Sequence, residues 1–567
     1  MKMVNIKVFL GMIISLLFVA CATVVPPSGG PKDTTPPIPL SFHPKSKVTN
    51  YQGEKIIIKF DEYIQLKDLN SQLVVSPAMA EDPDIYIQGK KLIIKPPDSL
   101  EENTTYTIFL GNSVVNYKEG LPVSHFQYVL ATGSTLDSLR IMGTLKNAFD
   151  LKTEEGLLIM LYKNTSDSTP YLQRPYYIAK TYSSGEFILD NLSEGSYLIF
   201  ALKDMNSNYL YDQPSEEIAF LDSLIVPAPA KPADDSLNLI HPIKVNMFLF
   251  KEIEKKQGIN RHVVLKPNLF ELDFKRPTEN LHIDPLNFTP QDNWYYPVFS
   301  ANTDSVKVWI TQKVPDTLMV KISEGGKVVD TLRLVLKKPR KKKSQGRRKK
   351  DVVKIDKNKS PKVVKLGVKT NTGNGLAFFS RPNLIFSTPV RGLNSDKIKF
   401  YRQEDTNYIP MDFRIYFKDT IAADVMVLDA ELQESTSYKL FFPDSVFFDI
   451  FGNTNDTLEV RFGTTKQRNY GRLKLHMDYH DSLPLLIQLL NDKDAVVQQT
   501  LLNDSVVIYP YLSPGIYKLK AIKDRNNNGK WDTGNYLDRL LPERVFYLNT
   551  SIKIRANWDI EQKWILE

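Results

Sequence analysis

An internal repeat constrains the fold of this chain more than any other feature of its sequence. The stretch Asp524–Asp532 reads DRNNNGKWD, and the stretch Asp204–Asp212 in the first half of the chain reads DMNSNYLYD. Both follow the same Leu-Ser-x-Gly-x-Tyr lead-in, which begins at Leu192 in one case and at Leu512 in the other. Self-similarity of this kind means that the chain uses one type of folding module twice.

A looser repeat precedes each of these copies. Short apolar runs end in Phe60 and in Phe386, and alternating runs contain Tyr106 and Tyr438. The members of these pairs are separated by nearly the same distance along the chain as the two Asp-rich stretches. Because two different modules recur with nearly the same offset, the sequence indicates duplication of a pair of modules.

Length and composition then bound the fold class. A chain of 567 residues is too long for one hydrophobic core, so about three to five domains are expected. Hydrophobic residues make up 42% and charged residues 24%, which is typical of globular proteins. Proline (35) outnumbers glycine (26), and aromatic residues are frequent, which favours many short strands joined by turns. We therefore predict an all-β fold of tandem β-sandwiches.

The N-terminus has the pattern of an export signal. Two lysines precede an apolar run, Val8–Ala20, that is too short and too early for an ordinary membrane-spanning helix. Cys21 directly follows this run, and the segment resembles the signal of bacterial lipoproteins, in which the cysteine becomes the lipidated first residue. The resemblance implies a signal peptide at 1–20, a lipid on Cys21 and a flexible tether at 21–35. The alternative is a simple secretory signal with an incidental cysteine.

Cysteine usage and the tether bear on location. Cys21 is the only cysteine of the chain, which excludes a disulfide within the chain and any site built on a cysteine pair. No acidic cluster directly follows it, whereas the surface-export tags of some Bacteroidetes-type lipoproteins are acidic there. We therefore expect an outer-membrane lipoprotein, held to the membrane by its lipid anchor, and favour an orientation toward the periplasm over display on the cell surface.

Residues 36–135 contain alternating runs every eight to twelve residues, a spacing typical of β-sandwiches. The opening Pro36-Pro37, the strand that ends in Phe60, the Thr105-Tyr106-Thr107 strand and the closing Phe126 to Gly133 resemble the bacterial Ig-like domain of S-layer and envelope proteins. The internal repeat predicts a second Ig-like domain at 367–467.

Residues 136–227 contain a different pattern. Gly185-Glu-Phe187 is followed by Leu192-Ser-Glu-Gly195-Ser-Tyr197, which resembles the carboxypeptidase regulatory-like, transthyretin-type β-sandwich. The family name does not imply peptidase activity. The repeat predicts a second such module at 468–567. Residues 228–336 also have the alternation of strands but resemble no recognised type.

A basic linker is predicted at 337–366. Ten of the fourteen residues from Lys337 to Lys350 are basic, and this tract accounts for the positive net charge of +8. One interpretation is a solvated, disordered loop; the other is binding of anionic lipid head groups. The residues that would bind them are Lys341, Lys342, Lys343, Arg347, Arg348, Lys349 and Lys350. Nucleic acid is not expected as a partner, because no aromatic residues interleave with the basic ones.

The repeated Asp-x-Asn-x-Asn stretches are candidate calcium loops, since this spacing directs oxygen ligands toward one point. The candidate ligands are Asp524, Asn526, Asn528 and Asp532 in the second copy, and Asp204, Asn206, Asn208 and Asp212 in the first. Gly529 stands at the sixth position, where a sharp turn needs positive φ. Tyr209 replaces it in the first copy and strains the turn, and Glu216 and Glu217 could compensate as additional ligands. The alternative is a hairpin rich in turn-forming Asn and Asp.

No catalytic motif supports an enzyme: the sequence has no HExxH, GxSxG or phosphate-binding glycine loop. We therefore expect a non-catalytic envelope protein with a binding, adhesive or scaffolding role, with envelope proteins or glycans as partners and no cofactor beyond possible calcium. One alternative is an accessory lipoprotein of an envelope assembly or transport machine. A less favoured alternative is an envelope enzyme that acts on glycans.

Overall fold

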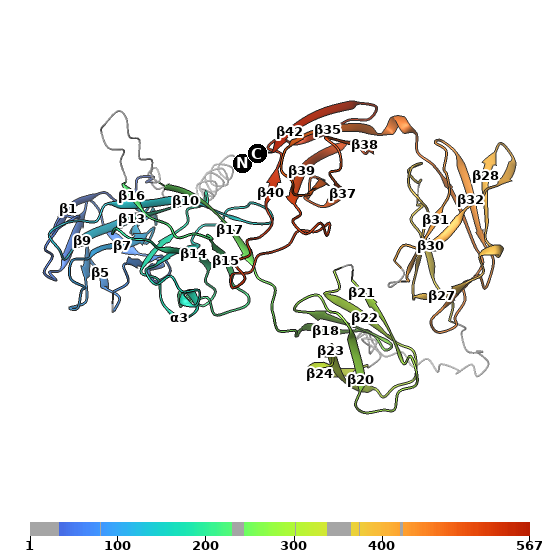
Figure 1. Ribbon diagram of the computed structural model, residues 1–567, viewed down its shortest axis with the longest axis horizontal. Helices are drawn as coiled ribbons and strands as arrows, with labels where there is room; N and C mark the ends of the chain where they lie inside the picture. The colour runs from blue at the N-terminus through green and yellow to red at the C-terminus, as the bar shows by residue number, and fades with distance from the viewer. Residues whose placement is uncertain are drawn as a thin grey trace, which may run out of the picture. The chain divides into compact units, whose positions relative to one another are not determined.

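The computed structural model describes residues 33–79, 81–229, 243–300, 302–336, 364–373, 375–419 and 423–566. Cys21 with its proposed signal peptide, and the basic residues from Lys341 to Lys350, lie outside the described residues. The described chain is nearly all β, as predicted, and forms two compact units that divide after Leu249, except that 148–151 belong to the second unit. Strands predominate in both units (Figure 1). None of the helices in the described ranges is long and apolar enough to cross a membrane.

The first sandwich comprises residues 39–131. One sheet has the order β1-β2-β6-β5, formed by Pro39–His43, Ile56–Phe60, Lys91–Lys95 and Asp84–Gln88. The other has the order β4-β7-β9, formed by Val74–Ser76, Thr105–Gly111 and Phe126–Ala131. The pair β3 (Ile64–Leu66) and β8 (Val114–Asn116) and the short helix α2 (Leu69–Gln72) complete it. Lettered in chain order, the main strands run A-B-E-D and C-F-G, which is the Ig constant-type order.

The core of this sandwich follows from side-chain alternation. In β2 the side chains of Ile56, Ile58 and Phe60 are fully buried, whereas Lys59 between them is exposed. Successive side chains of a strand point to opposite faces, so only one face of β2 enters the core. The rings of Tyr106 and Tyr128 fill the same core from the second sheet.

The second module comprises residues 139–147 and 152–249. Its strands have the order β12-β11-β14-β15-β17-β10-β13, with β16 beside β10. Their bounds are Leu139–Asn147 (β10), Leu158–Tyr162 (β11), Tyr177–Lys180 (β12), Glu186–Leu192 (β13), Leu198–Lys203 (β14), Glu217–Phe220 (β15), Ala228–Pro229 (β16) and Ile243–Lys251 (β17). A short helix, α3 (Thr169–Leu172), follows β11.

Strand β17 lies beyond residue 227, where the sequence pattern predicted this module to end. It pairs in parallel with β10, from Ile141 opposite Ile243 to Asn147 opposite Leu249. Met247 and Leu249 are buried in the same hydrophobic cluster as Ile141. The module therefore extends to Leu249, because its core needs this last strand.

The third sandwich comprises residues 259–335, for which the sequence indicated β structure of no recognised type. One sheet has the order β18-β19-β22-β21, formed by Ile259–Lys266, Leu269–Phe274, Ser305–Ile310 and Tyr295–Phe299. The other has the order β20-β23-β24, formed by Leu281–Pro285, Thr317–Glu324 and Lys327–Val335. In chain order this is again A-B-E-D and C-F-G, so the third sandwich has the strand order of the first.

The fourth sandwich comprises residues 368–463 and repeats the first with one added strand. One sheet has the order β25-β26-β31-β30, formed by Val368–Thr370, Asn383–Phe386, Val425–Asp429 and Arg414–Phe417. The other has the order β29-β28-β32-β34, formed by Asn407–Pro410, Lys399–Glu404, Ser437–Phe442 and Leu458–Gly463. The pair β27 (Val390–Leu393) and β33 (Phe447–Asp449) corresponds to β3 and β8. The 3-10 turns η1 (Ser395–Lys397) and η2 (Gln467–Asn469) lie within and after it.

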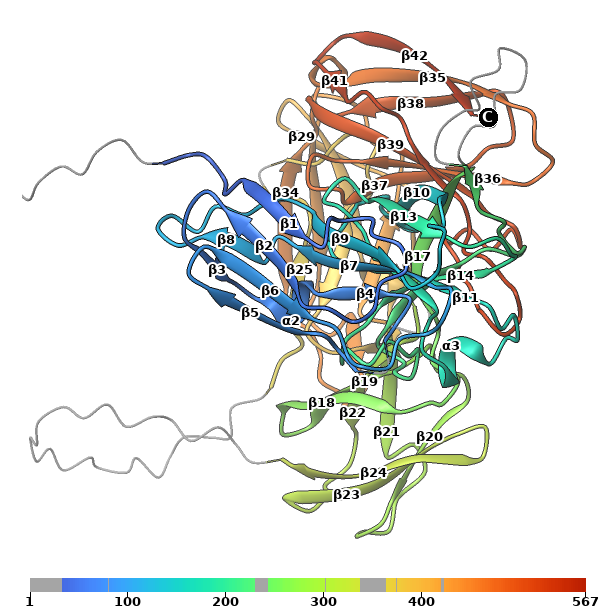
Figure 2. The same cartoon turned by 90° about the vertical axis from the view of Figure 1, so that its left-hand side faces the viewer.

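The fifth module comprises residues 471–566 and repeats the second. One sheet has the order β38-β35-β42, formed by Val506–Leu512, Gly471–Tyr479 and Asp559–Leu566, and Figure 2 shows these strands side by side. The other has the order β37-β36-β39-β40, formed by Val496–Leu501, Leu485–Leu490, Gly515–Lys523 and Val545–Tyr547, and β41 (Ile552–Ile554) also pairs with β39. The last strand, β42, is parallel to the first, β35, just as β17 is parallel to β10. The repeated modules predicted from the sequence are therefore present.

Candidate functional site

The second Asp/Asn loop connects β39 to β40 and is organised around Asp524. This carboxylate is fully buried. Its Oδ1 accepts the backbone N–H of Asn528 at 3.0 Å, and its Oδ2 accepts that of Gly529 at 2.7 Å. A buried carboxylate needs such donors, because burial without hydrogen bonds disfavours its charged form. Asp524 therefore holds the turn in place.

Asp532 closes the other side of this loop. Its Oδ2 accepts the Nδ2 of Asn526 at 2.6 Å and the Nδ2 of Asn528 at 2.8 Å. The two amide oxygens accept backbone N–H groups instead, Asn526 Oδ1 from Asn528 and Asn528 Oδ1 from Lys530. The four predicted ligands thus lie together, and they hydrogen-bond to one another and to the loop backbone.

The first Asp/Asn loop connects β14 to β15 and repeats this network. Asp204 Oδ1 accepts the N–H of Ser207 at 2.7 Å, and Oδ2 accepts that of Tyr209 at 2.8 Å. The Nδ2 groups of Asn206 and Asn208 donate to Asp212 at 3.1 and 2.7 Å. The sixth position has positive φ in both copies, 62° at Tyr209 and 72° at Gly529. A tyrosine in this backbone conformation is strained where a glycine is not.

A buried glutamate completes each loop. Glu216 is fully buried and accepts the backbone N–H groups of Met205, Asp212 and Gln213 at 3.1 to 3.2 Å. Glu543 accepts those of Arg525 at 2.7 Å and Asp532 at 3.0 Å. Burial raises the pKa of Glu543, and the nearby charges of Asp532 and Asp524 add to this effect.

The sequence pattern suggested Glu216 but missed Glu543. Glu543 follows Asp532 at a greater distance than Glu216 follows Asp212, so no spacing rule includes both. The sequence of the strand that follows each loop could have identified Glu543. Glu216-Glu-Ile-Ala-Phe220 leads into β15, and Glu543-Arg-Val-Phe-Tyr547 leads into β40, so an alignment of these two segments identifies the pair.

For a cation, these loops offer oxygen ligands only after local rotation. The amide nitrogens of Asn526 and Asn528 face Asp532, and their oxygens would have to turn inward to bind a metal. Among the residues that the structure describes, no group of three or more His, Cys, Asp and Glu side chains is arranged to hold a metal ion. The observed hydrogen bonds stabilise the turn without a cation.

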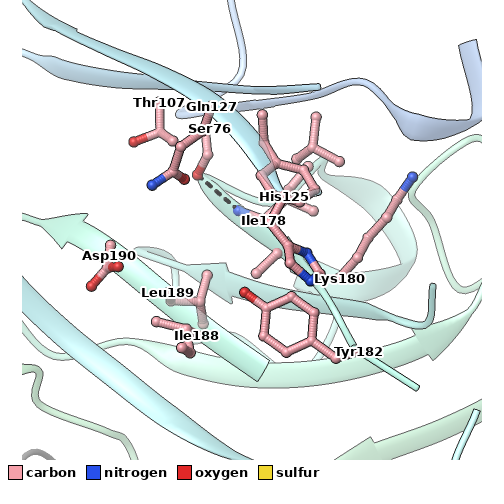
Figure 3. A pocket seen from close by; sticks show the side chains of 13 residues that line it. Ser76, Thr107, His125, Gln127, Ile178, Lys180, Tyr182, Ile188, Leu189 and Asp190 are labelled. Carbon is pink, nitrogen blue, oxygen red and sulfur yellow. Dashed lines mark hydrogen bonds between the residues drawn. The ribbon is translucent and has the colours of Figure 1, made fainter. Parts of the chain in front are cut away.

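A pocket of about 120 Å³ lies where the first sandwich meets the second module (Figure 3). Ser76 on β4 and Thr107 on β7 line it from the sandwich. The Oγ of Ser76 accepts the backbone N–H of Ile178 on β12 at 3.0 Å. The Nδ2 of Asn191 donates to Thr107 Oγ1 at 2.9 Å. These bonds join two modules of the first compact unit, and no sequence motif indicated them.

Titratable side chains border this pocket. The rings of His125 and Tyr182 are in edge contact, with centroids 4.3 Å apart. Burial raises the pKa of Tyr182, and the charge of Asp190 acts in the same direction. Burial lowers the pKa of Lys180, whose Nζ donates to the carbonyl of Ser71. The pocket is thus polar at its rim and is built by the joint between two β-sheets.

Comparison with known proteins gives the following similarities. No curated protein matches the sequence. Among solved structures, the S-layer protein rSbsC(31-844) is 10% identical with a TM-score of 0.13, over 89% of this chain and 66% of that one. The TIE protein of Bacillus anthracis is 10% identical with a TM-score of 0.13, over 95% and 76%. BcpA, the major pilin subunit of Bacillus cereus, is 8% identical with a TM-score of 0.14, over 76% and 99%.

These scores are too low to indicate a shared function. A family model gives a more specific result, because the bacterial Ig-like domain matches residues 33–128. This range contains every strand of the first sandwich except the last three residues of β9. The first β-sandwich of the chain is therefore similar to a bacterial Ig-like domain.

Proposed function

We propose that this protein is a non-catalytic, lipid-anchored envelope protein whose tandem β-sandwiches have a binding or scaffolding role. The observation that carries the proposal is repetition. The Ig-type strand order occurs three times, and the strand order of the second module recurs in the fifth, where it is divided between two sheets. A series of sandwiches presents many separate faces and edges to partners, whereas fold alone implies no chemistry.

The second and fifth modules are proposed to be carboxypeptidase regulatory-like, transthyretin-type sandwiches. Two observations support this assignment. Both copies keep the Leu-Ser-x-Gly-x-Tyr turn, at Leu192 and at Leu512, and in both the tyrosine hydroxyl donates back to the carbonyl of the serine, Ser193 or Ser513. The turn is thus tied by its own tyrosine in each copy.

The anchor and the basic tract complete the proposal. A lipid on Cys21 would hold the chain to the outer membrane, facing the periplasm, and the basic residues from Lys341 to Lys350 would add attraction to anionic head groups. The partners would be envelope proteins or glycans. Calcium would be an optional stabiliser of the two Asp/Asn loops.

Cross-linking in intact cells tests the binding role. Cells that produce the tagged protein are treated with a membrane-permeant cross-linker, and the protein is isolated under denaturing conditions. The proposal predicts covalent adducts with at least one other envelope protein or with envelope glycan. Recovery of the protein alone, or cross-linked only to itself, would contradict a binding role toward such partners.

A further inference from the structure

Strand β37 leaves one edge of the fifth module uncovered. It is the outer strand of the sheet β37-β36-β39-β40 and pairs only with β36 within the described residues. Val496 and Val497 are 51% and 50% exposed, and Gln498 and Gln499 are exposed as well. The free backbone groups of an edge strand can pair with another strand, and proteins normally block this with charge or proline.

β37 has neither block. Its sequence is VVQQTL, with no charged residue and no proline. Two other edge strands carry such charges: β24 has Lys327, Asp330 and Arg333, and β42 has Asp559, Glu561 and Lys563. β9 is also uncharged, but the segment at 47–51 covers it through hydrogen bonds to Val129 and Ala131. β37 therefore differs from these three edge strands in being both uncharged and uncovered.

The corresponding edge in the second module is used for docking. Ile159 on β11 faces Ala201, and Ile487 on β36 faces Ala521, so these strands correspond. One strand further out, Ile178 on β12 then corresponds to Gln499 on β37. The N–H of Ile178 points outward and donates to Ser76 Oγ of the first sandwich, which leaves Ile178 only 9% exposed. In this fold the edge is thus a docking edge.

In the fourth and fifth modules the equivalent contact is not made between the described residues. Strand β4, which covers β12 in the first pair, corresponds to β28 in the fourth sandwich by its place in the strand order. β28 already pairs with the added strand β29, from Tyr401 opposite Pro410 to Glu404 opposite Asn407. The edge that β4 uses is therefore occupied in β28, and β37 keeps a free edge.

The outward groups of β37 can be assigned from the ladder. The N–H of Leu502 donates inward to the carbonyl of Leu485. Successive residues of a strand alternate in direction, so Thr500 and Gln498 also point inward, and Gln499 and Leu501 point outward. This agrees with the outward N–H of Ile178 at the corresponding position.

The polarity of the strand indicates its occupant. From Val496 to Leu502 the residues are Val, Val, Gln, Gln, Thr, Leu and Leu, a pattern that is palindromic in polarity about Gln499. In an antiparallel pair of two identical strands centred there, Gln499 lies opposite Gln499, Gln498 opposite Thr500, and Val497 opposite Leu501. Polar side chains thus lie opposite polar ones, and apolar side chains lie opposite apolar ones. Matched pairs of this type stabilise neighbouring strands.

We propose that two copies of the chain associate through antiparallel pairing of their β37 strands about Gln499. The contact is isologous, so it closes after two subunits and joins the two five-stranded sheets into one. A bulge at Val497 bends the amino end of the strand, so the regular part of the ladder runs from Gln498 to Thr500 about Gln499. The proposal does not depend on the membrane anchor.

Sedimentation of the purified Cys21→Ala chain tests the proposal. The chain should show a concentration-dependent monomer–dimer equilibrium. Gln499→Pro removes an outward N–H that is not part of the ladder with β36, and Val497→Lys places a charge on the edge. Each change should raise the dimer dissociation constant about ten-fold or more. Val328→Lys, on the exposed strand β24, is the matched control and should leave it unchanged.

A disulfide trap locates the contact independently. Since Cys21 is the only cysteine, Gln499→Cys in the Cys21→Ala chain introduces a single thiol. Opposite residues of an antiparallel ladder have Cα atoms about 5.5 Å apart, which suits a disulfide. Oxidation should give covalent dimers with Gln499→Cys and none with Val328→Cys. A monomer at every concentration, or a dimer that neither Gln499→Pro nor Val497→Lys weakens, would overturn the proposal.

Discussion

Asp524 shows how a single buried residue organises the backbone of a candidate site. Its buried carboxylate binds two backbone N–H groups of the loop, so the residue has a structural role whether or not a cation is present. The sequence could predict that the four candidate ligands lie together, because their spacing is local. It could not predict Glu543, because that carboxylate reaches the loop only through the pairing of β40 with β39.

Replacement of Asp524 tests the calcium proposal. A cation that binds only the folded loop stabilises it by mass action, on the order of 1 kcal/mol at a few times the dissociation constant. Millimolar calcium should therefore raise the melting temperature of the wild-type chain relative to chelator. Asp524→Ala should abolish this rise, and Asp204→Ala should have a smaller effect because Tyr209 strains the first loop. Identical melting curves with calcium and chelator would leave the loops as turns only.

Neighbouring glutamates in the first loop provide a matched comparison. Glu216 is buried and accepts three backbone N–H groups, whereas Glu217 is half-exposed at the start of β15. Glu216→Ala leaves buried donors unsatisfied and should lower the free energy of unfolding by about 2 kcal/mol or more. Glu217→Ala should change it by less than about 0.5 kcal/mol. Urea denaturation measures both, and equal effects would contradict the role assigned to Glu216.

Lys520 on β39 predicts a pH dependence of stability. Its side chain is buried, and burial lowers its pKa from 10.5 to about 8. Between these two values the unfolded chain binds more protons than the folded chain, so stability rises with pH, by at most about 1.4 kcal/mol per pH unit. The free energy of unfolding should thus increase from pH 8 toward pH 10.5. Lys520→Met should flatten this part of the profile, and an unchanged slope would show that another group causes it.

At the scale of elements, the repeated modules are closed by a parallel strand that no local pattern indicates. The predicted strand that ends in Phe60 and the predicted strand through Thr105 to Thr107 are observed as β2 and β7, because a short apolar or alternating run is a local signal. The pairing of β10 with β17 and of β35 with β42 joins segments that are far apart in the chain. Periodicity within one segment carries no information about such a partner.

Two glycines lie where the backbone of the closing segments approaches the first strand of each repeated module. Their substitution should therefore destabilise the fold. A Cβ on Gly143 of β10 would lie 2.3 Å from the carbonyl oxygen of Val245, and one on Gly471 of β35 would lie 2.4 Å from that of Arg555. Gly143→Ala and Gly471→Ala should each lower the free energy of unfolding by about 1–3 kcal/mol through overpacking. Gly392→Ala is the control, since no atom lies within 4 Å of its Cβ position. A loss with Gly392→Ala as large as with the other two would contradict this account.

At the scale of the whole molecule, the sequence predicted the duplicated pair but not the identity of the third sandwich. The repeat was visible because the Asp/Asn loops and their lead-in require particular residues for their turns. The strands from β18 to β24 have the same A-B-E-D and C-F-G order but keep no such marker, because many apolar sequences satisfy one strand order. The pocket between the first two modules was also missed, since it exists only once the sheets are joined.

The central claim is that the chain is a tethered envelope protein, and fractionation of cells tests it most directly. Wild-type and Cys21→Ala forms are produced at equal levels, the envelope is washed with high salt, and the distribution between membrane and soluble fractions is measured. The lipid anchor predicts that the wild type stays with the membrane. It predicts that Cys21→Ala is released, because the single acylated residue is lost. Equal retention of both forms in the membrane fraction would contradict the anchor and with it the proposed function.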